Sequence, residues 1–128
     1  MVKCIATDKK YQCTIDLKSA NYRLFLDTSK ERGGLGDGIS PHELLEAAAA
    51  ACLNISIRIA LDSLGIKADN VTVEVNLIRS VEGKSIFEYQ YNIGDELNDE
   101  QKEKIEESIL SCPVRQTLLK EICYKRIE

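Results

Sequence analysis

The sequence has little of what metal sites and hydrolase triads require. It contains one histidine, His42, and no closely spaced cysteine and histidine residues, so we expect no zinc site. The lone histidine and the absence of a G-x-S-x-G motif also disfavour a Ser-His-Asp hydrolase. The glycine-rich run GGLGDG lacks the G-x-G-x-x-G spacing that binds phosphate. We therefore expect neither a metal nor another cofactor.

An excess of basic charge and a long apolar run are absent too. The formal net charge is −4, which gives no attraction for nucleic acid or an anionic membrane surface. Polar side chains interrupt the longest apolar region, 44–61, and no window reaches the roughly 18 apolar residues of a membrane span. The first ten residues have no apolar stretch of signal-peptide length. The sequence thus predicts no nucleic-acid or membrane partner and a cytoplasmic location.

What the sequence does contain is enough for one domain, 1–128, without internal repeats. Residues 2–7, 11–17 and 22–27 have strand-like patterns, and a turn at 8–10 predicts a hairpin between the first two. Residues 28–41 carry four of the seven glycines and are polar, which indicates a loop. Long loops in compact domains are often functional.

A long helix is predicted directly after this loop. Ser40 suits the N-cap, Pro41 the first helical position, and Glu43 completes an S-x-x-E capping box. Residues 44–63 are apolar on nearly all sides, which is typical of a buried helix, and Gly65 ends it. One sheet can cover only one face of such a helix, so we expect a homodimer to supply the second layer.

The remaining pattern predicts a hairpin and two further helices. Residues 71–78 and 86–93 alternate and are joined by a turn near Gly83. An N-x-x-Q box at 98–101 begins an amphipathic helix, and Pro113 ends it and opens a short one. Residues 122–127 read as a last strand. The fold class is α+β with a mainly antiparallel sheet.

The five cysteines are expected to start out reduced, and their odd number argues against a full disulfide framework. Cys4, Cys13 and Cys123 lie on predicted strands, where core packing is the expected role. Cys52 lies in the long helix, too far from its start for the helix dipole to acidify the thiol. Cys112 precedes Pro113 as an N-cap, where backbone N–H groups favour a thiolate. Sixty residues separate Cys52 from Cys112, so the pattern alone leaves each as either a packing residue or a reactive thiol.

Two motifs connect these cysteines to a known family. The stretch SPHELLEAAAAAC at 40–52, followed sixty residues later by CPV at 112–114, resembles the OsmC/Ohr family of osmotically induced and organic-hydroperoxide-resistance proteins. The similarity extends from about Tyr22 to the C-terminus. It implies an intertwined homodimer in which mainly antiparallel sheets wrap around long buried central helices, with thiol peroxidase sites at the dimer interface.

The resemblance also implies roles for particular residues. Cys52 matches the peroxide-reactive cysteine, Cys112 the resolving cysteine, and Arg32 the active-site arginine of the preceding loop. Peroxidase members have a glutamate ten residues before the reactive cysteine; here that position is His42, and Glu43 follows it. Glu43 is a site candidate, but it also suits the capping box. Along one helix it would lie about 13 Å from Cys52 and on the opposite face.

These assignments imply a two-cysteine reduction of organic hydroperoxides, completed by an external dithiol. Cys52 would become a sulfenic acid, and Cys112 would condense with it to a disulfide. Two other interpretations remain open. The dimer could bind a small apolar ligand without catalysis, or the thiols could act on substrates other than peroxides.

Overall fold

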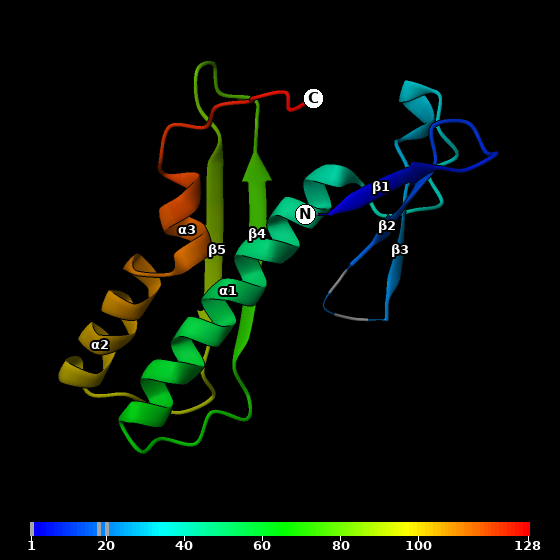
Figure 1. Ribbon diagram of the computed structural model, residues 1–128. Coiled ribbons are helices and arrows are strands. Elements are labelled where there is room, and N and C mark those ends of the chain that lie inside the picture. Colours follow the sequence, from blue (N-terminus) through cyan, green and yellow to red (C-terminus); the bar gives the residue numbers. More distant parts are fainter. Residues whose placement is uncertain (1, 18, 20) are drawn as a thin grey trace. The chain divides into compact units, whose positions relative to one another are not determined.

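The computed structural model describes residues 2–17, 19 and 21–128 (Figure 1). The chain forms two compact units, Met1–Leu45 and Glu46–Glu128, and each is described by itself. The described chain has the expected α+β character: both units contain antiparallel strands, and the long helix lies mostly in the C-terminal unit. The assignment of 1–128 to a single domain stays a prediction.

The N-terminal unit is built on a three-stranded antiparallel sheet. Its strands are β1 (Lys3–Ala6), β2 (Cys13–Asp16) and β3 (Arg23–Leu26), in the order β1-β2-β3. The register pairs Ala6 with Cys13, which confirms the predicted hairpin. All three strands lie inside the ranges that the alternation predicted.

The loop after β3 is ordered by one buried carboxylate. Asp27 is 3% exposed, and its side chain accepts backbone hydrogen bonds at 2.7, 3.2 and 3.2 Å from Thr28, Leu35 and Asp37. Gly34 lies so close to the Thr28 carbonyl that a Cβ atom there would collide with it. This packing supports a short 3-10 turn, η1 (Lys30–Arg32), where the sequence predicted only irregular loop.

The long helix α1 (Pro41–Ser63) begins and ends as its sequence predicted. In the capping box, the Ser40 backbone N–H donates to Glu43 Oε2 at 3.4 Å and the Glu43 N–H donates to Ser40 Oγ at 3.1 Å. At the other end, Gly65 has a φ of 70°, and the Ile66 N–H donates to the Leu61 carbonyl at 2.9 Å. This is a Schellman ending, in which glycine adopts the left-handed conformation without a Cβ penalty.

In the C-terminal unit, α1 packs with one hairpin and two shorter helices (Figure 1). The hairpin consists of β4 (Thr72–Ile78) and β5 (Ile86–Asn92), and the helices are α2 (Asp99–Leu110) and α3 (Pro113–Leu118). The predicted N-x-x-Q capping box of α2 is present. The fully buried core comes mainly from one face of α1 and one face of α2: Leu53, Ile57, Leu61, Ile105 and Ile109.

One face of α1 is buried within the C-terminal unit and the opposite apolar face is not, which agrees with the expectation that one sheet covers only one face of this helix. Ile55 and Ile59, on the face opposite Ile57, are 54% and 65% exposed. The hairpin, α2 and α3 form a layer on one face only, so the other apolar face has no cover from this unit. By length and composition α1 could also cross a bilayer, a property that it shares with core helices of soluble proteins.

The prediction of a last strand at 122–127 is wrong. Residues 121–128 are exposed and form no strand, because the sheet of the C-terminal unit contains only β4 and β5. Two cysteines that were expected in the core are exposed instead. Cys123 is exposed in this tail, and Cys4 is exposed on β1, whereas Cys13 is half-buried.

Candidate functional site

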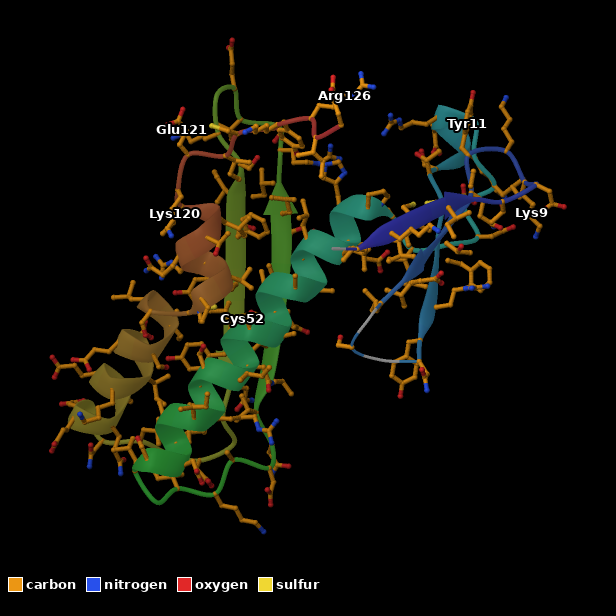
Figure 2. The ribbon with its side chains drawn as sticks, in the orientation of Figure 1. Lys9, Tyr11, Cys52, Lys120, Glu121 and Arg126 are labelled. Carbon is orange, nitrogen blue, oxygen red and sulfur yellow. The ribbon has the colours of Figure 1, made fainter. Side chains whose placement is uncertain are left out.

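Two thiols from distant parts of the sequence meet in the C-terminal unit. Cys52 lies midway along α1 (Figure 2), and Cys112 follows α2 as the N-cap of α3. The Cys112 thiol donates to Cys52 Sγ, with 2.8 Å between the sulfurs. Both cysteines are free. The fold therefore brings together the two cysteines that the sequence singled out.

Each sulfur is positioned by its neighbours in the core. Leu53, next to Cys52, and Ile109, three residues before Cys112, belong to the same buried apolar cluster. Pro113 ends the preceding helix and allows the chain to turn at Cys112. The turn places the Val114 backbone N–H 3.4 Å from Cys52 Sγ, to which it donates. Cys112 is 1% exposed, whereas Cys52 is only partly buried.

The surroundings of Cys52 favour the neutral thiol. Burial raises the pKa of Cys52, and the adjoining Cys112 thiol raises it further, as a hydrogen-bond partner of the neutral thiol and through its own charge when it is ionised. The Val114 N–H and the Ser56 side chain oppose this effect, because both hydrogen-bond to the thiolate. These two opposing groups are neutral, so a cation would be needed to make the thiolate abundant at neutral pH.

The other two predicted site residues belong to the N-terminal unit. Arg32 is exposed on η1 in the N-terminal unit. Glu43 is exposed and its carboxylate accepts the capping bond from Ser40, which gives it the structural role that the sequence also allowed. Their roles in catalysis stay predictions.

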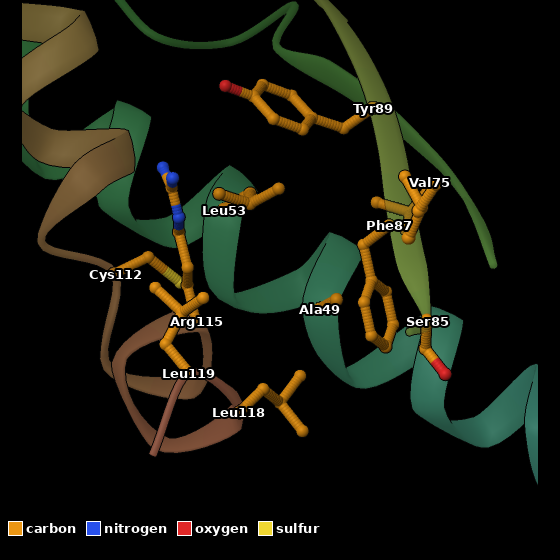
Figure 3. Close-up of a pocket in the computed structure, with 11 residues that line it drawn as sticks. Ala49, Leu53, Val75, Ser85, Phe87, Tyr89, Cys112, Arg115, Leu118 and Leu119 are labelled. Carbon is orange, nitrogen blue, oxygen red and sulfur yellow. The ribbon is translucent and has the colours of Figure 1, made fainter. Parts of the chain in front are cut away.

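A cavity of about 270 Å³ lies beside Cys112, one of the two thiols (Figure 3). Cys112 and Arg115 are among the residues that line it, together with side chains of α1, α3 and both strands. Arg115 was not predicted from the sequence, although its position three residues after Cys112 places it about one turn along the short helix. Among the described residues, no group of three or more His, Cys, Asp or Glu side chains could hold a metal ion.

The chain is similar to a family and to several solved structures. The family model for OsmC-like proteins matches residues 34–124. A Psychrobacter arcticus protein named for osmotic stress induction and a detoxification response has a TM-score of 0.79 and 20% identity, covering 91% of this chain and 85% of that one. A Legionella pneumophila organic hydroperoxide resistance protein has a TM-score of 0.67 and 21% identity, covering 93% and 88%.

A third neighbour has no assigned activity. It is an OsmC-like protein of unknown function from Vibrio cholerae, with a TM-score of 0.67 and 11% identity, covering 94% of this chain and 95% of that one. No curated protein matches the sequence. At these identities the three structures show the fold, and the chemistry has to be argued from the residues of this chain.

Proposed function

Because the chain belongs to the OsmC-like protein family, whose model matches residues 34–124, we propose that it reduces organic hydroperoxides with two thiols. The contact between Cys52 Sγ and Cys112 Sγ, 2.8 Å apart, carries this proposal. A pair of thiols in contact can pass between dithiol and disulfide without large movement of the backbone. The Legionella neighbour, named as an organic hydroperoxide resistance protein, adds support for the substrate class.

The two thiols supply the two electrons that reduce the peroxide, and one external dithiol restores them. The Cys52 thiolate attacks one oxygen of the peroxide bond, and the other oxygen leaves with a proton as an alcohol. Cys52 is then a sulfenic acid. The Cys112 thiol attacks its sulfur, a disulfide forms and water leaves. An external dithiol reduces the disulfide by exchange and is itself oxidised.

Arg32 supplies the cation that the Cys52 environment needs. Burial and the neighbouring Cys112 thiol both raise the pKa of Cys52, and the nucleophilic thiolate is therefore scarce. A guanidinium beside the sulfur would stabilise the thiolate and the charge that develops on the departing oxygen. In this proposal Glu43 acts at most through Arg32, because its carboxylate holds the start of α1.

The proposed enzyme is a cytoplasmic homodimer. A second copy would cover the exposed apolar face of α1, on which Ile55 and Ile59 lie. A reducing compartment would return both thiols to the reduced state after each turnover.

Counting thiols after peroxide treatment tests the proposal. In a Cys4→Ser/Cys13→Ser/Cys123→Ser background, only Cys52 and Cys112 remain. We expect one equivalent of cumene hydroperoxide to remove both thiols and to form an intramolecular disulfide visible by mass spectrometry. In this background Cys52→Ser should remove the reaction, whereas Cys112→Ser should leave a sulfenic acid that dimedone traps. Two thiols that survive excess peroxide would contradict the proposal.

A second candidate is a binding protein whose thiols are idle. The raised pKa of Cys52 and the histidine at the glutamate position of the peroxidase members favour it. A fold does not by itself determine an activity, and the Vibrio neighbour has this fold with no assigned function. If the thiols resist peroxides but react with a disulfide or a persulfide, another thiol chemistry is indicated.

A further inference from the structure

The cavity beside Cys112 is apolar over most of its wall. Leu53 of α1, Val75 of β4, Phe87 of β5 and Leu118 of α3 all line it. Its volume of about 270 Å³ lies just below the range of pockets for drug-sized molecules, which begins at about 300 Å³. The space therefore suits a small apolar molecule.

One cation enters this apolar space. Arg115 lines the cavity, and Figure 3 shows its side chain among Cys112, Leu53 and Tyr89. Its Nη1 atom is buried and has no hydrogen-bond partner among the described residues. The two ion pairs of the described chain involve other residues: Arg23 with Asp16, and Lys67 with Asp69.

An unpartnered guanidinium nitrogen is unfavourable in such a place. Arginine stays protonated in proteins, so it cannot escape the cost of burial by losing its charge. Removing a polar group from water without a hydrogen bond costs stability, and removing a charge costs more. Its planar fork of donors matches a carboxylate in particular. An anionic group in the cavity would pair with the guanidinium that lines it and would offset part of this cost.

From these contacts we propose that the cavity binds a small apolar carboxylate, with the carboxylate on Arg115 and the hydrocarbon part among Leu53, Val75, Phe87 and Leu118. The inference goes beyond the proposed peroxidase, since binding requires neither thiol to react. It also gives Arg115 a role separate from that of Arg32.

Calorimetric titration of the reduced full chain with octanoate and octanamide tests this proposal. The two probes share a hydrocarbon part, and only octanoate carries a charge. We expect octanoate to bind at least tenfold more tightly than octanamide. Arg115→Gln should weaken octanoate binding at least tenfold and leave octanamide binding unchanged. Arg79→Gln, at an exposed arginine that does not line the cavity, should bind both probes as the unaltered chain does.

Thermal unfolding separates ligand binding from a structural role of Arg115. Without ligand, Arg115→Gln should unfold no earlier than the unaltered chain, because the arginine Nη1 makes no hydrogen bond to lose. Octanoate should raise the unfolding temperature of the unaltered chain and not that of the variant. Cys52→Ser, which lacks the reactive thiol, should bind octanoate as tightly as the unaltered chain. Octanoate binding therefore tests this proposal even if the protein fails to reduce peroxides. Equal affinity for the two probes, absence of octanoate binding, or unchanged octanoate affinity in Arg115→Gln would each overturn the proposal.

Discussion

At the scale of single residues, the chemistry depends on how often Cys52 is a thiolate. Its contacts within the C-terminal unit act in opposite directions. Burial and the Cys112 thiol raise its pKa, and the Val114 N–H and Ser56 lower it. Because burial is the largest of these effects, Cys52 needs a nearby cation before its thiolate is abundant at neutral pH. The proposed cation is Arg32.

Replacing Arg32 should therefore change the pH dependence of the peroxide reaction. We expect Arg32→Ala to raise the pKa of Cys52 and to slow its oxidation at pH 7 by roughly tenfold for each unit of increase. The difference between the two rates should narrow as the pH rises, because both proteins then hold the thiolate, and the difference that remains at pH 10 measures the stabilisation of the departing oxygen. Stopped-flow measurement of sulfenic acid formation between pH 6 and pH 10 would follow this. Lys30→Ala, two residues away on η1, is the matched control. Equal rates in Arg32→Ala and the unaltered chain at every pH would remove Arg32 from the mechanism.

At the scale of elements, α2 is tied to the sheet by a side-chain bond. Tyr91 on β5 donates its hydroxyl to Glu106 Oε1 on α2 at 2.8 Å. Burial and this carboxylate raise the pKa of Tyr91 to about 12. The bond fixes one side of the helix that ends next to Cys112. It therefore couples the hairpin to the position of one thiol.

Removing the Tyr91 hydroxyl should lower stability without changing the core. We expect Tyr91→Phe to lower the free energy of unfolding by about 1 kcal/mol, the usual net contribution of one hydrogen bond. The difference should be full below pH 10 and should shrink as the pH rises toward 12, because the folded protein resists ionisation of the phenol until then. Urea titrations at pH 7 and at pH 11 measure both effects. Tyr89→Phe, two residues along β5 and more exposed, should change stability little at pH 7; a loss in that variant equal to the loss in Tyr91→Phe would refute the assignment.

The elements were largely predictable because their signals are local. The capping box at Ser40, the glycine at 65 and the alternation of both hairpins each involve a few neighbouring residues. The last strand was predicted wrongly because a strand depends on more than local sequence. Residues 122–127 have an acceptable strand composition, but a strand also needs a neighbour, and the sheet of this unit ends with β4 and β5.

The site was predictable only where a motif marked it. Cys52 and Cys112 were identified by resemblance, and their contact required a fold that spans sixty residues of sequence. Asp27 and Arg115 gave no such signal. An aspartate in a polar loop and an arginine in a short helix usually face solvent, and only tertiary packing shows that the first orders a loop and the second has a buried, unpartnered nitrogen.

The assembly of the protein depends on the second apolar face of α1, which the rest of the C-terminal unit leaves uncovered. Ile55 and Ile59 lie one turn apart on it, and both are more than half exposed. Isolated exposed apolar residues are common on monomers, but an apolar row along a helix of this length is typical of an interface. We expect two copies to pack these faces together, since a closed two-fold dimer uses the same patch on both chains.

A charge placed on this face should separate the copies. Full burial of an isoleucine side chain contributes about 1.5–3 kcal/mol, and a twofold interface contains each residue twice. We therefore expect Ile59→Glu to raise the dimer dissociation constant at least roughly a hundredfold, as measured by sedimentation equilibrium. Val81→Glu, an exposed position at the turn between β4 and β5, should leave it unchanged. A monomeric unaltered chain at micromolar concentration, or an Ile59→Glu variant that still sediments as a dimer, would show that this face is covered in some other way.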